Sequence, residues 1–232
     1  MEPNLGNLET SLKLKFKNKD LLKNAFIHRS YLNEHPEVAI PHNERLEFLG
    51  DAVLGLIVSE HLFNKYPNHP EGDLTNFRSS LVNARTLSTA AANLELGQYL
   101  YLSKGEESTG GRARQYILAN TFEALVGAIY IDQGLSSTKK FVEKFLLIYL
   151  ADIIDKKLYK DFKSLLQEKS QEQLGVTPSY RIVEEKGPDH AKIFRTAVYL
   201  NNKKISTGNG NSKQAAEQQA AKQALETWSK KN

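Results

Sequence analysis

Apolar side chains up to residue 152 recur at spacings of three and four residues, which is the period of an α-helix. The pattern holds in four long segments and two shorter ones: residues 43–65, 73–97, 112–131 and 137–152, and residues near 7–16 and 20–28. Turn-forming residues lie between them at 35–41, 66–70 and 108–111. We find no alternation of apolar and polar residues typical of a strand. The pattern therefore predicts an all-α first domain over residues 1–152.

The period changes beyond residue 160. Residues 162–174 have a helical pattern, which Gly175 ends as a C-cap. Three strand-like runs follow at residues 180–183, 193–200 and 203–207, and Asn201-Asn202 fits a two-residue hairpin turn. Ser212 can cap a last, alanine-rich helix that runs to Trp228. We expect a small α+β domain of order α-β-β-β-α over residues 161–230, joined to the first domain by a linker at residues 153–160.

The composition is that of an ordinary folded protein, with 40% apolar and 25% charged residues among 232. There is no cysteine, which excludes disulfides, thiolate zinc sites and iron–sulfur clusters. The longest apolar runs, at residues 125–131 and 145–151, are far shorter than the ~20 residues that span a bilayer. The N-terminus lacks the pattern of a signal peptide. We therefore expect a cytoplasmic protein with no membrane partner.

Charge is divided unevenly along the chain, whose formal net charge is +4. Residues 1–155 hold 16 Lys and Arg against 19 Asp and Glu, a net charge of −3. Residues 156–232 hold 15 against 8, a net charge of +7. A basic C-terminal part suggests a polyanionic partner. Charge alone does not distinguish nucleic acid, an anionic membrane surface and simple solubility.

An acidic stripe marks the first long helix. At about 100° per residue, Glu44, Glu47 and Asp51 fall within roughly 60° of one another. The opposite side carries the expected core residues, and three further apolar residues flank the acidic side: Leu46, Leu49, Val53, Leu56 and Ile57 in the core, and Phe48, Leu54 and Val58 on the flank. Carboxylates placed one above another repel unless a cation intervenes. Solvated surface charges are the alternative interpretation.

The helix over residues 112–131 carries a second polar pair, Asn120 and Glu123, among small residues that allow a neighbouring helix to approach closely. Burying such a pair is costly unless it is hydrogen-bonded or bound to a cation. Together the two helices offer only oxygen donors, which suit Mg²⁺ first and Mn²⁺ second. Carboxylate-held Mg²⁺ typically serves phosphoryl chemistry. A buried hydrogen-bond network without a ligand explains the second helix, taken alone, equally well.

Four segments resemble the motifs of the ribonuclease III family. Residues 43–54 (NERLEFLGDAVL) match its signature stretch almost residue for residue, residues 121–130 (TFEALVGAIY) and 71–75 (EGDLT) are similar to two further motifs, and residues 25–31 (AFIHRSY) are similar to its N-terminal segment. The C-terminal part resembles a double-stranded RNA-binding domain, with GPDH at residues 187–190 and SKQAAEQQAA at residues 212–221. The resemblance covers nearly the whole chain.

The resemblance implies a homodimeric endoribonuclease that needs Mg²⁺, with Mn²⁺ as a substitute, and no organic cofactor. It would cleave double-stranded RNA to 5′-phosphate and 3′-hydroxyl ends with short 3′ overhangs, in the processing of ribosomal precursors and other RNA. By motif, the catalytic residues are Glu47, Asp51 and Glu123, which hold the metal together with Asn120; Glu44 and Glu71 are accessory acidic positions; and Phe48, Leu54 and Val58 fit the dimer seam. Glu71 is also explained as an acid at a helix N-terminus.

Asn120 departs from the family pattern, which most often has aspartate at this position. Asparagine keeps one oxygen donor and loses a negative charge, so metal affinity should fall. The hypothesis is an active enzyme with a raised Mg²⁺ requirement. The alternative is a double-stranded RNA-binding regulator whose catalysis is weakened.

The resemblance also implies three RNA contacts in the C-terminal domain, because duplex RNA is recognised by its shape and its minor grooves. The contact residues would be Gln167 and Gln171 on the first helix, His190 in the loop, and Ser212 and Lys213 at the start of the last helix, facing phosphates. Solvated surface residues are the alternative for each. Gln214 and Glu217 replace common lysines, so we expect modest binding with a strong dependence on salt.

The apolar residues of the C-terminal domain are expected to form a core instead of stacking on bases. They are Tyr180, Ile182, Phe194, Ala197, Tyr199, Ala216, Ala220 and Trp228. Proteins that bind single strands expose aromatic residues on their sheet, whereas here we expect helices to cover it. Binding of single-stranded RNA is therefore the weaker hypothesis.

Overall fold

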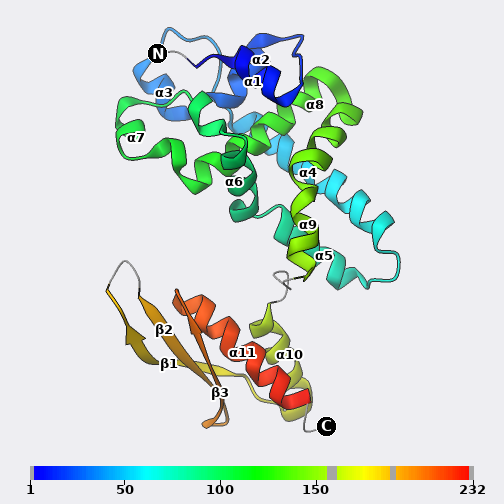
Figure 1. Ribbon diagram of the computed structural model, residues 1–232, viewed down its shortest axis with the longest axis vertical. Helices are drawn as coiled ribbons and strands as arrows, with labels where there is room; N and C mark the ends of the chain where they lie inside the picture. Colours follow the sequence, from blue (N-terminus) through cyan, green and yellow to red (C-terminus); the bar gives the residue numbers. More distant parts are fainter. Residues whose placement is uncertain (1–2, 156–160, 189–191, 230–232) are drawn as a thin grey trace. The chain divides into compact units, whose positions relative to one another are not determined.

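Two long helices, α4 (Glu44–Lys65) and α8 (Gln115–Phe145), cross in the first unit of the chain (Figure 1). Their backbones touch, because both helices have glycine at the crossing. A Cβ on Gly50 would lie 1.8 Å from the carbonyl oxygen of Glu123, and one on Gly127 would lie 2.3 Å from that of Leu46. The crossing therefore depends on glycine at both positions.

The computed structural model describes residues 3–155, 161–188 and 192–229, and it divides the chain into two units between residues 159 and 160. The other helices of the first unit surround α4 and α8: α1 (Leu5–Leu12), α2 (Lys19–Phe26), α3 (Arg29–Glu34), α5 (Glu71–Leu81), α6 (Ala84–Asn93), α7 (Lys104–Ser108) and α9 (Leu150–Asp155), with 3₁₀ turns at residues 96–99, 111–113 and 147–149. Large buried side chains such as Phe26, Phe77 and Phe122 fill the core between them.

The predicted helices are present, with changed limits. The single helix expected over residues 73–97 is two helices, α5 and α6, because Asn83 caps the second by accepting a hydrogen bond from Thr86 N at 2.9 Å. The gap expected between residues 131 and 137 is a kink inside α8 at Gly134, whose φ is 77°. Residues 153–155 of the expected linker are helical, and Ile153 is buried in the core. Residues 156–160 lie outside the described residues.

Hydrogen bonds from buried amides fix the start of α4. Asn43 donates through Nδ2 to the carbonyl oxygen of Ala25 at 3.2 Å, and its backbone N–H donates to that of Ile27 at 2.9 Å. Asn24 donates to the carbonyl oxygen of His42 at 3.1 Å. The segment around Ile27 is in turn paired with Tyr101 in an isolated β-bridge. Residues 27–28 are therefore held beside the first turn of α4.

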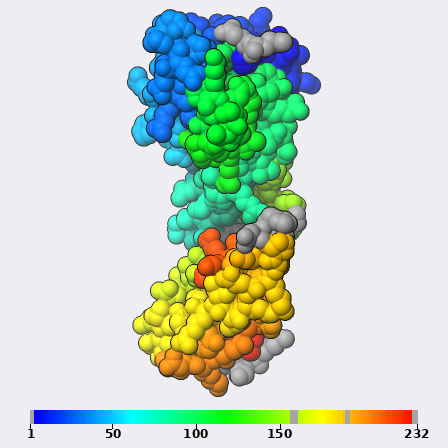
Figure 2. Space-filling view, turned by 90° about the vertical axis from the view of Figure 1, so that its left-hand side faces the viewer, coloured from blue at the N-terminus to red at the C-terminus, as the bar shows by residue number. Residues whose placement is uncertain are grey.

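The segments of α3 and α7 are also joined to each other. Ser103 donates through its backbone N–H to Ser30 Oγ at 3.1 Å, and Lys104 N donates to Glu34 Oε2 at 3.1 Å. Figure 2 shows the two segments at the surface on this side of the unit, α7 in green and α3 in blue. The contact fixes the position of α3 from a second direction.

The second unit has the order α-β-β-β-α and confirms the predicted fold class. The strands β1 (Ser179–Lys186), β2 (Ile193–Leu200) and β3 (Lys203–Gly210) form an antiparallel sheet in the order β1-β2-β3. The helices α10 (Phe162–Leu174) and α11 (Lys213–Ser229) lie on one side of it (Figure 1). Asn201 and Asn202 both have positive φ, as a two-residue hairpin turn requires, and Gly175 ends α10 with φ 66°.

Helix α11 lies close to β3 because Gly208 has no side chain. A Cβ there would lie 2.2 Å from the backbone nitrogen of Ala220. The core of this unit is small and contains Leu166, Val198, Ala220, Ala221 and Ala224. Ile182, which we expected in this core, is 38% exposed, because the edge strand β1 has a register shift at this point. In the part of the chain that the structure describes, no helix is long and apolar enough to cross a membrane.

We predict that Gly50→Ala destabilises the first unit by at least about 2 kcal/mol, since a side chain there meets backbone that cannot move alone. Thermal unfolding measures the change. Gly72→Ala is the matched control, because a Cβ on Gly72 has no neighbour within 4 Å. Equal melting temperatures for the two variants would show that the glycine contact does not hold α4 and α8 together.

Candidate functional site

The helix crossing brings acidic side chains of α4 and α8 together. Glu47 and Asp51 lie on either side of Gly50, which touches the backbone of Glu123. Glu47 and Glu123 are half-buried, whereas Asp51 and Glu44 are exposed. The crossing therefore brings Glu47 and Asp51 of α4 beside Glu123 of α8, although some seventy residues separate the two helical segments in the sequence.

The pKa values of Glu47 and Glu123 reflect their burial and the carboxylates beside them. Burial, together with the charges of Asp51 and Glu47, raises the pKa of Glu123 to about 7. The pKa of Glu47 is also raised, first by burial and then by the charges of Glu44 and Asp51. Neighbouring carboxylates thus disfavour the negative charge on both Glu47 and Glu123. A positive ion between them would remove this repulsion.

Asn120 acts on Glu47 directly. Its side-chain amide forms a hydrogen bond with the Glu47 carboxylate, which lowers the pKa of Glu47 and partly offsets the effect of burial. A carboxylate only accepts hydrogen bonds, so the amide nitrogen must donate. The amide oxygen of Asn120 remains as a possible ligand. An aspartate at this position, when ionised, could not make the same contact.

The donors present fit a hard divalent cation: three or four carboxylates and one amide oxygen, with neither thiol nor imidazole among them. Among the described residues, no three His, Cys, Asp or Glu side chains already converge as a set of metal ligands. Asp51 and Glu47 lie near enough to Glu123 to raise its pKa, and side-chain rotations would have to bring the three carboxylates around one ion.

A pocket of about 260 Å³ adjoins these acids. The sequence alone assigns no role to three of the residues that line it, His28, Arg29 and Tyr116. Residues of α4, α8 and the start of α3 line it, together with the residues just before α3 and α4: His28, Arg29, Asn43, Glu44, Glu47, Tyr116, Ile117 and Asn120. The Arg29 guanidinium lies 3.9 Å from the Glu44 carboxylate. No periodic signal points to His28, because it precedes α4 by sixteen residues.

Glu71 is placed differently from the other acids. It begins α5 and accepts a hydrogen bond from Thr75 Oγ1 at 2.7 Å. Its charge is not among those that shift the pKa of Glu47 or Glu123. Within one chain, its position as an acid in the first turn of α5 agrees with the helix-terminal interpretation.

An exposed apolar stripe runs along α4 beside the acids. Phe48 is 80% exposed, Leu56 59% and Phe63 71%, and Ala52 is exposed between them. At about 100° per residue these four side chains fall within roughly 80° of one another. The structure corrects two expectations: Leu56 is not in the core, and Leu54 and Val58, expected at the seam, are fully buried.

In the second unit, four of the five residues expected to contact RNA are described, and all four are exposed: Gln167, Gln171, Ser212 and Lys213. Gln167 and Gln171 lie on the surface of α10, and Lys213 begins α11. Ser212 Oγ accepts a hydrogen bond from Ala215 N at 3.1 Å, so its hydroxyl caps α11. His190 lies outside the described residues.

The fold and the site indicate a nuclease that carries its own RNA-binding domain. The helical domain holds a cluster of oxygen donors, and an α-β-β-β-α domain follows it. The family model described as Ribonuclease-III-like matches residues 18–150, and the double-stranded RNA binding motif matches residues 162–227. The chain therefore belongs to the ribonuclease III family, as its motifs suggested. It is an endoribonuclease that acts on double-stranded RNA, in a family that depends on divalent metal ions.

Individual relatives agree over nearly the whole chain. Ribonuclease 3 of Nitratiruptor sp. is 43% identical, covering 98% of both chains, and that of Streptococcus mutans is 46% identical, covering 94% of both. Among solved structures, the nuclease domain of ribonuclease III from Campylobacter jejuni is similar, with 39% identity and a TM-score of 0.58. The match covers 62% of this chain and 97% of that domain.

Glu123 predicts how stability depends on pH. Its pKa rises from 4.5 to about 7 on folding, so the stability it contributes is present below pH 4.5 and is lost as the pH rises through 7. In metal-free buffer, Glu123→Gln should therefore raise the melting temperature more at pH 8 than at pH 5, by about 2–4 °C. Glu143→Gln, an exposed position on the same helix, is the control. The same gain at both pH values would contradict the shifted pKa.

Proposed function

We propose that the chain is a Mg²⁺-dependent enzyme that cleaves both strands of double-stranded RNA. Its products would be 5′-phosphate and 3′-hydroxyl ends with short 3′ overhangs. One observation carries the proposal: the glycine crossing of α4 and α8 gathers Glu47, Asp51 and Glu123 beside Asn120. Hard oxygen donors of this kind favour Mg²⁺, with Mn²⁺ as the substitute.

Each residue has a part that follows from its surroundings. Glu47, Asp51, Glu123 and the amide oxygen of Asn120 would hold the ion, and the amide nitrogen of Asn120 orients Glu47. Glu123 must lose its proton to serve as a ligand, which its pKa of about 7 allows near neutral pH. Glu44 and Glu71 are accessory acids. When bound, the ion supplies activation of water and neutralisation of charge on the phosphodiester.

The alternative of a regulator with weakened catalysis rests on Asn120 alone. The amide makes a contact with Glu47 that lowers its pKa, and it retains an oxygen donor. Asn120 is thus integrated into the site, so we favour the active enzyme.

In the second unit, we propose that exposed groups of α10 and α11 hold the duplex. Gln167 and Gln171 suit ribose hydroxyls in a minor groove, and Lys213 with the first turn of α11 suits phosphates. His190 and the hydroxyl of Ser212 complete the proposed set. Phosphate contacts of this kind make affinity fall steeply with salt concentration.

We also propose that the enzyme is a homodimer joined along the exposed stripe of α4, defined by Phe48, Ala52, Leu56 and Phe63. Side chains this apolar are seldom left together in water. The structure of the Campylobacter jejuni nuclease domain describes a region involved in dimer formation. Because the stripe borders the acids on the same helix, pairing two chains would place both sites beside one seam.

We further propose that the enzyme acts in the cytoplasm. The absence of cysteine is compatible with the cytoplasm. The substrates would be precursors of ribosomal RNA and other transcripts with double-stranded segments.

The cleavage proposal predicts that Asp51→Asn and Glu123→Gln each lower the cleavage rate of a long RNA duplex in Mg²⁺ by at least about a hundredfold. Each loses a charged metal ligand, while the second unit still binds RNA. Gel shift in Ca²⁺ should therefore give unchanged duplex affinity. Glu143→Gln serves as the control and should cleave at the wild-type rate. A wild-type protein that binds the duplex and does not cut it would support the regulator instead.

The dimer proposal predicts that Phe48→Asp converts a dimer to a monomer, because it places a charge in the seam. Light scattering coupled to gel filtration gives the molar mass directly. Ile148→Asp changes a side chain of similar exposure outside α4 and should leave the dimer intact. A wild-type mass of 26 kDa, that of one chain, would refute the dimer.

A further inference from the structure

The pocket beside the acids has a second wall that binding of the metal ion does not use. This wall consists of His28, Arg29 and Tyr116, which line the pocket of about 260 Å³ together with Glu44, Glu47 and Asn120. The other two acids, Asp51 and Glu123, do not line the pocket. The pocket therefore lies to one side of the point where the carboxylates meet.

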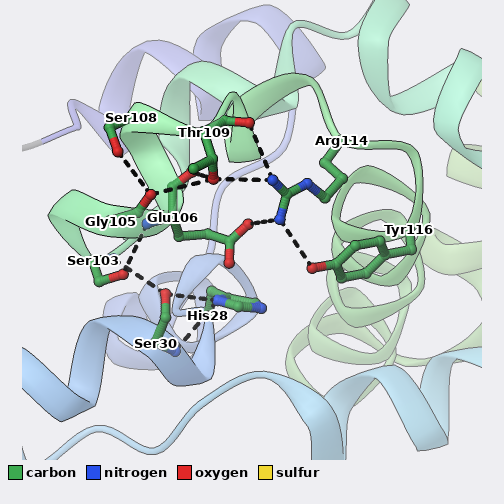
Figure 3. Close-up of polar contacts among 9 residues, drawn as sticks. All are labelled: His28, Ser30, Ser103, Gly105, Glu106, Ser108, Thr109, Arg114 and Tyr116. Atoms are coloured by element: carbon green, nitrogen blue, oxygen red, sulfur yellow. Dashed lines mark hydrogen bonds and ion pairs between the residues drawn. The ribbon is translucent and has the colours of Figure 1, made fainter.

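His28 is held in a defined orientation. The backbone N–H of Ser30 donates to His28 Nδ1 at 3.3 Å, and Ser30 Oγ lies 2.8 Å from the same atom. An Nδ1 that accepts a backbone hydrogen bond carries no proton, so the proton of the neutral ring is on Nε2. Burial lowers the pKa of His28, which keeps the ring neutral at pH 7. Figure 3 shows Nδ1 turned toward Ser30 and the other ring nitrogen pointing away from the bonded groups.

The surroundings of His28 are fixed from several sides. Its backbone N–H donates to the carbonyl oxygen of Tyr101 at 3.1 Å, and Ser30 Oγ accepts from Ser103 N at 3.1 Å. Near His28 and Ser30, Glu106 and Arg114 form an ion pair, and Arg114 also donates to the carbonyl oxygen of Thr109 at 3.1 Å (Figure 3). The Nε2–H donor is thus set in place before any ligand binds.

The chemistry of the wall suits an anion. It offers a neutral N–H donor and the Arg29 guanidinium, which lies 3.9 Å from Glu44 and has its side chain 73% exposed. Of the two acids that line the pocket, Glu47 would be neutralised by the bound cation, and Glu44 is the one beside Arg29. A strand of RNA brings a phosphate on each side of the one being cleaved, and a pocket adjoining the cleavage point is where such a phosphate would lie.

We infer that His28 is a substrate-binding residue whose Nε2–H donates a hydrogen bond to a non-bridging oxygen of the phosphate next to the scissile one. This inference rests on the cleavage site proposed above. His28 also caps α3 through Nδ1, so a capping role alone is the competing explanation.

His28→Asn separates the two roles, because asparagine is as good a cap and cannot reach the pocket as the imidazole does. We expect the melting temperature to stay at the wild-type value and kcat/KM for a short RNA duplex at saturating Mg²⁺ to fall at least tenfold. A hydrogen bond to a charged group has about this effect. His28→Ser, which can also cap α3, is a second variant should the first fold poorly. His35→Asn, at the other end of α3, is the matched control and should retain full activity.

Substrates with a single methylphosphonate linkage, scanned along the cleaved strand, provide a test that a structural role would not affect. Wild type should lose at least tenfold in rate at a linkage next to the cleavage point, and His28→Asn should lose less than threefold at that linkage. Equal cleavage by wild type and both His28 variants, or equal sensitivity of His28→Asn and wild type to every linkage, would overturn the inference. A wild type that does not cleave at all would instead refute the proposed function.

Discussion

The contact between the backbones of α4 and α8 is the constraint on which the site depends. Gly50 and Gly127 let the two helices approach until a carbonyl oxygen of one lies where a side chain of the other would begin. This approach places Glu47 and Asp51 against Glu123, so the site and the centre of the helical core are the same contact. Elements farther away, such as the buried amides of Asn24 and Asn43, fix the start of α4 at this crossing.

The acids that the crossing gathers lower the stability of the fold. Burial, with a further contribution from neighbouring negative charges, raises the pKa of Glu47 and raises that of Glu123 to about 7. The surrounding core, with Phe122 and Leu125 fully buried on the same helix, tolerates this cost. Groups that oppose folding and serve no packing purpose are typical of functional sites. The uncharged amide of Asn120 lowers the pKa of Glu47 and adds no negative charge to the cluster.

The two units divide recognition and chemistry. The second has a small core and matches the double-stranded RNA binding motif, and we propose that its exposed glutamines and the lysine at the start of α11 contact the duplex. The first combines the acidic cluster, the apolar stripe of α4 and the wall around His28. All three features involve α4 or the residue before it: the acids and Phe48 lie on α4, and Asn43 is hydrogen-bonded to Ala25 and Ile27, next to His28.

Local sequence determined several features of the two units. The acids share one face of α4 because of helical geometry, the hairpin follows from Asn201 and Asn202, and Gly175 ends α10 because glycine adopts positive φ readily. Tertiary structure decided which apolar residues are buried: Leu54 and Val58 lie in the core and Leu56 faces solvent, since α8 covers a side of α4 that no local pattern identifies. It also decided that His28 and Glu47 line one pocket, because contacts between distant segments, and not spacing along the chain, bring them together.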